Sequence, residues 1–191
     1  KTIKVKTDKG TELTAEFSSG IKWIKCDGNI SEMKTKWSNL PDGEVFTCPE
    51  KINGTAIVDG SLGDYLGKKY GVLEKNPIKL TIENSKIINV ECKNKELENE
   101  LKEYILQDEN ANKIGEFAVG TNIGLKKIVG NLLQDEKFPS VHIAAGSPYP
   151  DETGAKWDSK AHCDFVITKT TITIDGEEIM AKGKFIKEIL N

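Results

Sequence analysis

Residues 140–168 read SVHIAAGSPYPDETGAKWDSKAHCDFVIT, and they place two apolar, strand-like segments on either side of a long loop. Segments 140–145 and 162–168 predict strands, whereas 146–160 is rich in Gly, Pro and Asp and predicts a loop. The only two histidines of the chain, His142 and His162, lie in these two segments. The pattern therefore predicts neighbouring strands that bring both imidazoles to one part of the fold.

The rest of the chain changes its period along the sequence. Apolar residues alternate through most of the first half and predict strands; from about residue 95 to 107 they recur at helical spacing. A last hairpin is predicted around Asp175-Gly176. The predicted strands of the first half are 2–7, 11–17, 21–26, 43–48, 54–59 and a hairpin of 78–82 with 88–92, and the predicted helices are 95–107 and 123–134.

This order of strands, then helices, then strands predicts an α+β fold, mainly antiparallel, with two or three helices in the second half. No internal repeat or linker divides residues 1–191, so we expect a single domain. The chain begins at Lys1 within a strand-like alternation, from which we expect a domain excised from a longer protein.

Composition excludes two classes of partner. The net charge is −3, with 27 basic and 30 acidic residues, and no basic residue is an arginine. Without the planar guanidinium fork there is little basis for reading bases or phosphates, so we expect no nucleic-acid partner. No run of 18 apolar residues and no signal-peptide pattern occurs, which argues against a membrane partner. Four scattered cysteines without a CxxC pair favour a reducing, cytoplasmic setting.

The residues best suited to chemistry are His162 and Asp164. They are two positions apart, so in a strand both side chains project from the same face, while Cys163 between them faces the core. Together with His142 they form a set of imidazole and carboxylate donors that suits zinc, cobalt, manganese or iron. The alternative is that His142 is a hydrogen-bonded core histidine and that His162 and Asp164 form a surface pair.

Two glutamates differ from the other acidic residues. Glu44 follows a tight turn and Glu116 follows Gly115, and each adjoins an apolar run in which an unpaired carboxylate is costly. Thr121 and Asn122 follow Glu116; they either orient a metal ligand by hydrogen bonding or cap the helix predicted after them.

Loop 146–160 lies between the two histidine segments and carries Tyr149, Trp157 and Lys160. It is either one wall of a pocket or an ordinary surface connection with one aromatic anchor.

Four segments together resemble the thermophilic leucyl aminopeptidase-like metallopeptidases, the family of aminopeptidase T. Their order and spacing cover nearly the whole chain. The segments are 39–49 (NLPDGEVFTCP), 114–120 (IGEFAVG), 135–146 (DEKFPSVHIAAG) and 162–167 (HCDFVI).

The resemblance implies that two divalent metal ions, Zn, Co or Mn, are bound by Glu44, Glu116, His142, His162 and Asp164. It also implies an α/β domain ahead of this one, which would make the chain the C-terminal lobe of a two-domain protein, and it implies a homodimer. In this alignment Thr121 and Gly130 stand where the family has an assisting histidine and tyrosine.

The leading hypothesis is therefore a metal-dependent aminopeptidase that hydrolyses N-terminal peptide bonds of a peptide substrate, with Glu44 or Glu116 as the group that takes the proton. A second hypothesis is a ring-cleaving dioxygenase acting on a small heterocycle, because such enzymes resemble the same scaffold. It would use one Fe(II) held by His142, His162 and Asp164. A third is a metal-binding lobe without catalysis.

Overall fold

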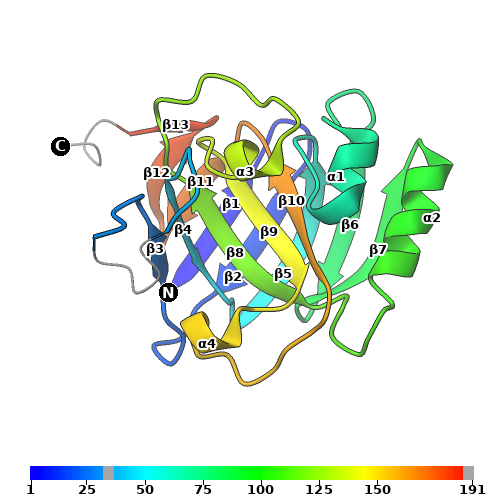
Figure 1. Cartoon of the computed structure of the whole chain (residues 1–191), viewed down its shortest axis with the longest axis horizontal. Coiled ribbons are helices and arrows are strands. Elements are labelled where there is room, and N and C mark those ends of the chain that lie inside the picture. The colour runs from blue at the N-terminus through cyan, green and yellow to red at the C-terminus, as the bar shows by residue number, and fades with distance from the viewer. Residues whose placement is uncertain (32–36, 187–191) are drawn as a thin grey trace.

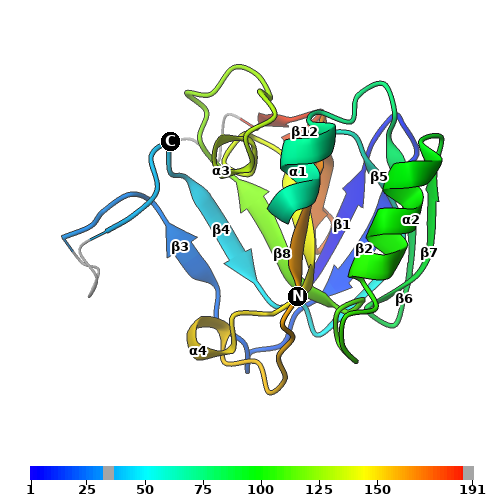
Figure 2. The ribbon, with the colours of Figure 1, turned by 45° about the vertical axis from the view of Figure 1, so that its right-hand side comes forward.

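The computed structural model describes residues 1–31 and 37–186, which form two antiparallel sheets with four short helices. The α+β prediction is confirmed. Figure 1 shows the smaller sheet lying in front of the larger one, and Figures 1 and 2 show α1 and α2 on one flank, with α3 and α4 at opposite ends of the smaller sheet. Among the described residues no helix has the length and apolar character needed to span a membrane.

The larger sheet has the strand order β13-β12-β11-β1-β2-β5-β6-β7. Its strands are β1 (Thr2–Lys6), β2 (Glu12–Glu16), β5 (Lys51–Val58), β6 (Ile78–Glu83), β7 (Lys86–Cys92), β11 (Thr171–Ile174), β12 (Glu177–Ala181) and β13 (Lys184–Phe185). The predicted hairpin at Asp175-Gly176 joins β11 to β12, and both residues adopt positive φ (49° and 96°), as a tight two-residue turn requires.

The smaller sheet has the strand order β10-β9-β8-β4-β3. Its strands are β3 (Ile24–Cys26), β4 (Glu44–Thr47), β8 (Ile114–Gly120), β9 (Val141–Gly146) and β10 (His162–Ile167). Segments 140–145 and 162–168, predicted to be neighbouring strands, pair as β9 and β10, with His142 opposite Val166 and His162 opposite Gly146. Segment 21–26, predicted as a strand, is extended in the sheet only over Ile24–Cys26.

The two sheets share one hydrophobic core, which fixes the faces of the smaller sheet. Phe117, Ile143 and Phe165 are in register across β8, β9 and β10, and all three are fully buried in the core. Cys163 points to the same side and is also fully buried, which agrees with its predicted packing role. The alternate residues of these strands therefore face away from the core, and that face carries the acidic and imidazole side chains.

The helices are α1 (Asp64–Tyr70), α2 (Lys95–Tyr104), α3 (Leu132–Asp135) and α4 (Pro150–Thr153). The helix predicted from 95 to 107 is present as α2. It is capped by Asn94, whose side chain accepts hydrogen bonds from two backbone N–H groups, and it buries Leu97, Leu101 and Tyr104. The short helices α1 and α4 were not predicted.

The helix predicted from 123 to 134 is wrong apart from its end, because only Leu132–Asp135 is helical. The fully buried Asp135 carboxylate accepts hydrogen bonds from the backbone N–H groups of Val129 and Gly130 and from the Ser61 hydroxyl. Gly130 has a φ of +81°, outside the helical range. The Asp135 side chain thus holds the end of residues 123–131 as a loop, and Ile123 and Val129 remain exposed.

Candidate metal centre

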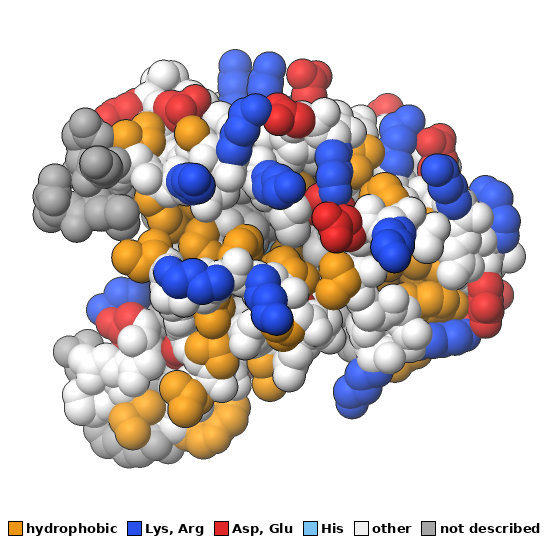
Figure 3. Space-filling view, turned by 90° about the horizontal axis from the view of Figure 1, so that it is seen from above, with side chains coloured by type: hydrophobic (Ala, Val, Ile, Leu, Met, Phe, Trp, Pro, Cys, Tyr) orange, Lys and Arg blue, Asp and Glu red, His pale blue; other side chains and the backbone are white. Residues whose placement is uncertain are grey.

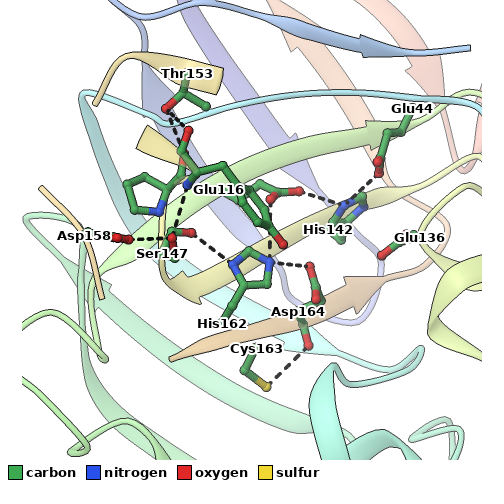
Figure 4. Close-up of polar contacts among 12 residues, drawn as sticks. Glu44, Glu116, Glu136, His142, Ser147, Thr153, Asp158, His162, Cys163 and Asp164 are labelled. Atoms are coloured by element: carbon green, nitrogen blue, oxygen red, sulfur yellow. Dashed lines mark hydrogen bonds and ion pairs between the residues drawn. The ribbon is translucent and has the colours of Figure 1, made fainter. Parts of the chain in front are cut away.

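The five residues predicted as metal ligands lie together on the face of the smaller sheet that points away from the core. Glu44 begins β4, Glu116 is on β8, His142 is on β9, and His162 and Asp164 are on β10. Figure 4 shows Glu116, His142, His162 and Asp164 pointing toward one another, with Glu44 and Glu136 on the His142 side.

Small residues on the neighbouring strands leave room for these side chains. Ala144 lies between Glu116 and Asp164 in the register, Ala118 is opposite His142, and Gly146 is opposite His162. Because paired residues share a face of a sheet, each long polar side chain has an alanine or glycine beside it. The pattern of large polar and small residues thus forms the hollow that contains the site.

Glu116 links the two histidines. Its Oε1 lies 3.2 Å from Nε2 of His142, and its Oε2 lies 3.7 Å from Nε2 of His162. Glu44 Oε2 completes the His142 side at 3.3 Å, and Asp164 Oδ1 completes the His162 side at 3.5 Å. Each histidine therefore presents Nε2 to two carboxylate oxygens.

Glu136 also belongs to this cluster, although it was not among the predicted ligands. Within three groups, the ligand-type atoms lie within 4.8 Å of one another. The groups are Glu44–Glu116–His142, Glu116–His162–Asp164 and Glu136–His142–Asp164. Glu136 follows α3 directly, and the only signal that could have found it was its place in segment 135–146, which carries the resemblance.

Lys137, next along the chain, is also part of the site and was also missed. Its side chain is only 2% exposed, and its Nζ donates to Glu44 Oε1 at 2.5 Å and contacts Glu136 Oε1 at 2.8 Å. Burial lowers the pKa of Lys137, but the two carboxylates outweigh burial and hold that pKa above its usual range. The ammonium is therefore a fixed positive charge within the cluster.

The hydrogen bonds around His162 set which of its nitrogens faces the cluster. Its Nδ1 lies 3.0 Å from the carbonyl oxygen of Ser147, so this nitrogen carries the proton and Nε2 faces the carboxylates. The Tyr104 hydroxyl from α2 contacts both the backbone N–H and the carbonyl of His162, each at 3.1 Å. The position of this imidazole is thus fixed from two elements.

Burial and neighbouring charges both shift the pKa values of the cluster. Burial, followed by the charge of Asp164, raises the pKa of Glu136 to about 7. Burial lowers the pKa of His162, but Asp164 outweighs it and raises that pKa to about 9. Glu116 and Glu44 likewise raise the pKa of His142, against the effect of burial. Without a bound cation the imidazoles therefore retain protons that offset the carboxylate charges.

A cleft of about 620 Å³ opens onto the cluster. Its floor includes Glu116, His162 and Asp164, and its walls carry the apolar side chains Ile24, Trp37, Phe46, Leu132, Leu133 and Tyr149. On the face drawn in Figure 3, apolar side chains gather around a hollow with lysines beside them. The cleft can therefore hold an apolar group next to a strongly polar floor.

Loop 146–160 contributes one wall through Tyr149. The Tyr149 ring packs on the His162 ring with centroids 4.6 Å apart and meets Phe46 edge-on at 5.8 Å. Trp157 instead packs under the Lys113 ammonium, and Lys160 is exposed. Gly130 lies in the loop around Asp135, and Tyr149 supplies a tyrosine to the cleft from another segment.

Thr121 and Asn122 form hydrogen bonds with the backbone next to Glu44 and at Lys137. Thr121 N–H donates to the carbonyl of Gly43, and Asn122 Nδ2 donates to the carbonyl of Asp42, so both secure the turn before Glu44. Asn122 N–H also donates to the carbonyl of Lys137. The helix-cap alternative is wrong because residues 123–131 are not helical.

Comparisons with known proteins identify a family and relatives of this chain. Residues 1–188 match the family described as thermophilic metalloprotease (M29). Aminopeptidase AmpS of Bacillus subtilis (strain 168) is 31% identical over 193 residues, covering 92% of this chain and 45% of that protein.

Two solved structures share the fold. The 2,5-dihydroxypyridine dioxygenase from Pseudomonas putida KT2440 matches with a TM-score of 0.76 and 19% identity, covering 97% of this chain and 55% of that chain. Wild-type AmpT from Thermus thermophilus matches with a TM-score of 0.75 and 22% identity, covering 97% of this chain and 49% of that chain. The chain thus spans about half the length of these relatives.

Proposed function

The chain belongs to the thermophilic metalloprotease (M29) family, and from that premise we propose that it is the metal-binding part of an aminopeptidase that uses two divalent ions. The observation that carries the proposal is the bridging position of Glu116, whose two oxygens face two different histidines. One carboxylate between two imidazole-containing donor groups is the arrangement expected of a dinuclear centre.

The residues present fit such ions. Four carboxylates lie in one buried cluster, and crowding like charges away from water is costly unless cations compensate them. Glu44 Oε2 is buried and accepts no hydrogen bond from the described residues, although it faces His142. Imidazole nitrogen with carboxylate oxygen suits Zn, Co or Mn. When bound, such ions polarise a carbonyl and lower the pKa of water to about 7.

The chain's own residues have separate tasks under this proposal. Glu116 would contribute to two metal positions. His162 and Asp164 would complete one of them, the His162 half of the cluster, and His142 and Glu44 would complete the other, the His142 half. Glu136 lies beside the His142 half and provides a further carboxylate there. The apolar cleft walls would accept an apolar side chain at the N-terminus of a peptide.

Peptide hydrolysis tests the proposal directly. The protein is loaded with Zn, Co or Mn and assayed for release of free leucine from unblocked dipeptides, with N-acetylated dipeptides as controls. We expect release from the unblocked substrates only, and its loss on chelation and in Glu116→Gln. Activity that survives both treatments would exclude this site as its source.

A second candidate would use His142, His162 and Asp164, which are the donor types of a non-haem Fe(II) centre with two histidines and one carboxylate. The two histidines lie in different donor groups, with Asp164 in a group with each of them. A dioxygenase is also among the proteins that share the fold. Oxygen uptake with anaerobically loaded Fe(II) and 2,5-dihydroxypyridine, without peptide hydrolysis, would favour it. Metal binding with neither activity would favour a lobe that does not catalyse by itself.

A further inference from the structure

A buried lysine places its positive charge beside only one half of the cluster. Lys137 Nζ contacts Glu44 and Glu136, and both of these carboxylates belong to donor groups that contain His142. The third group, Glu116–His162–Asp164, contains neither of the carboxylates that Lys137 contacts. The ammonium thus lies beside one half of the cluster.

Resting on the proposed metal centre, we propose that Lys137 is a positioning residue that acts as a built-in counter-cation for the His142 half. It holds Glu44 and Glu136 in place when no metal ion is bound, and it makes that half the weaker of the two metal positions. The His162 half then binds its ion first and more tightly.

The contacts on Glu44 show how the lysine positions a carboxylate. Oε1 of Glu44 is taken by Lys137 at 2.5 Å, whereas Oε2 faces Nε2 of His142 at 3.3 Å. Only Oε2 is thereby left to act as a donor toward an ion at His142. The lysine thus commits Glu44 to coordination through one oxygen.

The backbone fixes the distance between Lys137 and Glu44. Asn122 donates from its backbone to Lys137 and from its side chain to Asp42, two residues before Glu44. Gly120 comes so close to the lysine segment that a β-carbon there would lie 2.7 Å from the carbonyl oxygen of Glu136. The backbone of Lys137 is therefore held beside Glu44, and the burial of its side chain, which is 2% exposed, keeps the ammonium in the cluster.

The sign of the effect follows from charge. Removing a positive charge that is held near a cation site reduces repulsion in the loaded state. It also leaves two buried carboxylates uncompensated in the metal-free state, which destabilises that state. Both changes strengthen binding of the ion at His142.

The experiment compares the wild type with Lys137→Met, which keeps the length of the side chain and removes its charge. Co(II) or Zn(II) is titrated into the metal-free protein by calorimetry, and thermal midpoints are recorded with and without metal. Lys102→Met is the matched control, because Lys102 pairs with Glu98 on α2, on a helix that carries none of the cluster residues.

We expect two binding events in the wild type. In Lys137→Met the metal affinity of the weaker binding event should rise by about tenfold or more, because the removed charge is close and largely shielded from water. The affinity of the stronger binding event should change much less. The metal-free midpoint should fall further than the metal-loaded midpoint. The inference would be overturned if the affinity of the weaker event stayed the same or fell, or if the affinities of both events changed equally.

If Lys137→Met does not fold without metal, the variant is purified with metal and release of the second ion to a chelator is timed. Slower release than from the wild type supports the inference, and faster release overturns it. A wild type that binds no metal would instead refute the proposed function, so the two failures are distinguishable.

Discussion

Gly63 lies directly against Asp164. A β-carbon at Gly63 would be 2.5 Å from the backbone nitrogen of Asp164 and 2.8 Å from its Oδ2. The backbone N–H of Gly63 also donates to the carbonyl of Asp164 at 2.9 Å. The segment that leads into α1 therefore covers the outer edge of β10 and sets the position of the carboxylate.

Gly63→Ala should displace Asp164 and weaken metal binding on the His162 side. We expect metal affinity to fall by at least about tenfold and stability to fall by roughly 1–3 kcal/mol, as for overpacking in a close-packed interior. Competition with a chelator and urea unfolding measure these two effects.

Gly20→Ala is the matched control, because its β-carbon would meet only Ser18 Oγ, at 3.9 Å, and its φ is not positive. Equal metal affinity in Gly63→Ala and Gly20→Ala would show that the contact does not position Asp164.

Glu116→Gln tests the bridge between the two histidines. Because its oxygens face both His142 and His162, this single change should weaken both metal positions. Asp164→Asn should weaken mainly the His162 position, since Asp164 Oδ1 lies within ion-pair distance of the His162 imidazole, at 3.5 Å. Metal content by mass spectrometry after dialysis should show little metal in the first variant and about one equivalent in the second.

Two equivalents retained in Glu116→Gln would contradict the bridging role. Near-ultraviolet circular dichroism of both variants confirms that folding is unchanged, because Glu and Gln have nearly the same shape.

The sequence indicates which residues share a face better than it indicates which segments meet. His162 and Asp164 are two residues apart, so their common face followed from the strand period alone. The period also predicted Cys163 as core, and it is fully buried. Antiparallel α+β architecture followed from the alternating segments for the same reason.

The parts that the sequence did not predict depend on particular side-chain contacts, which apolar periodicity does not show. Apolar spacing after residue 122 favours a helix, but the Asp135 carboxylate binds the backbone of Val129 and Gly130 and holds a loop. A Glu-Lys pair such as Glu136-Lys137 is usually exposed to solvent. Glu44 comes beside that lysine because β4 pairs with β8, with Glu44 opposite Gly120, and because Gly120 packs against the backbone of residues 136–138.

Tyr149 should support His162 through ring packing. Its ring lies 4.6 Å from the imidazole centroid, and burial followed by the charge of Asp164 holds its own pKa above the usual range. Tyr149→Ala should weaken metal binding several-fold, because ring pairs are worth about 0.5–1.5 kcal/mol and their loss frees the imidazole.

Tyr149→Phe retains the ring and should bind metal within about twofold of the wild type. Equal losses in both variants would assign the effect to the hydroxyl group, and no loss in Tyr149→Ala would exclude a supporting role. Calorimetric titration with Co(II) distinguishes these results.

Raising the pH should change metal affinity and metal-free stability in opposite directions. The pKa of His162 is about 9 in the folded, metal-free protein, against 6.5 for the ordinary side chain, so between these values the folded state binds more protons than the unfolded state. The stability contributed by this histidine is complete below pH 6.5 and is lost as pH rises through 9, by at most about 3 kcal/mol. The raised pKa of His142 acts in the same sense.

Metal affinity should rise over the same window, because an imidazole must lose its proton before it can bind a metal ion. Urea unfolding of chelator-treated protein at pH 6.5, 7.5 and 9 measures the first trend, and Mn(II) titration at the same pH values measures the second. His162→Gln removes the titrating group and should flatten part of both curves. Metal-free stability that rises with pH while Mn(II) affinity falls would contradict the charge arrangement described for β9 and β10, whatever reaction the site performs.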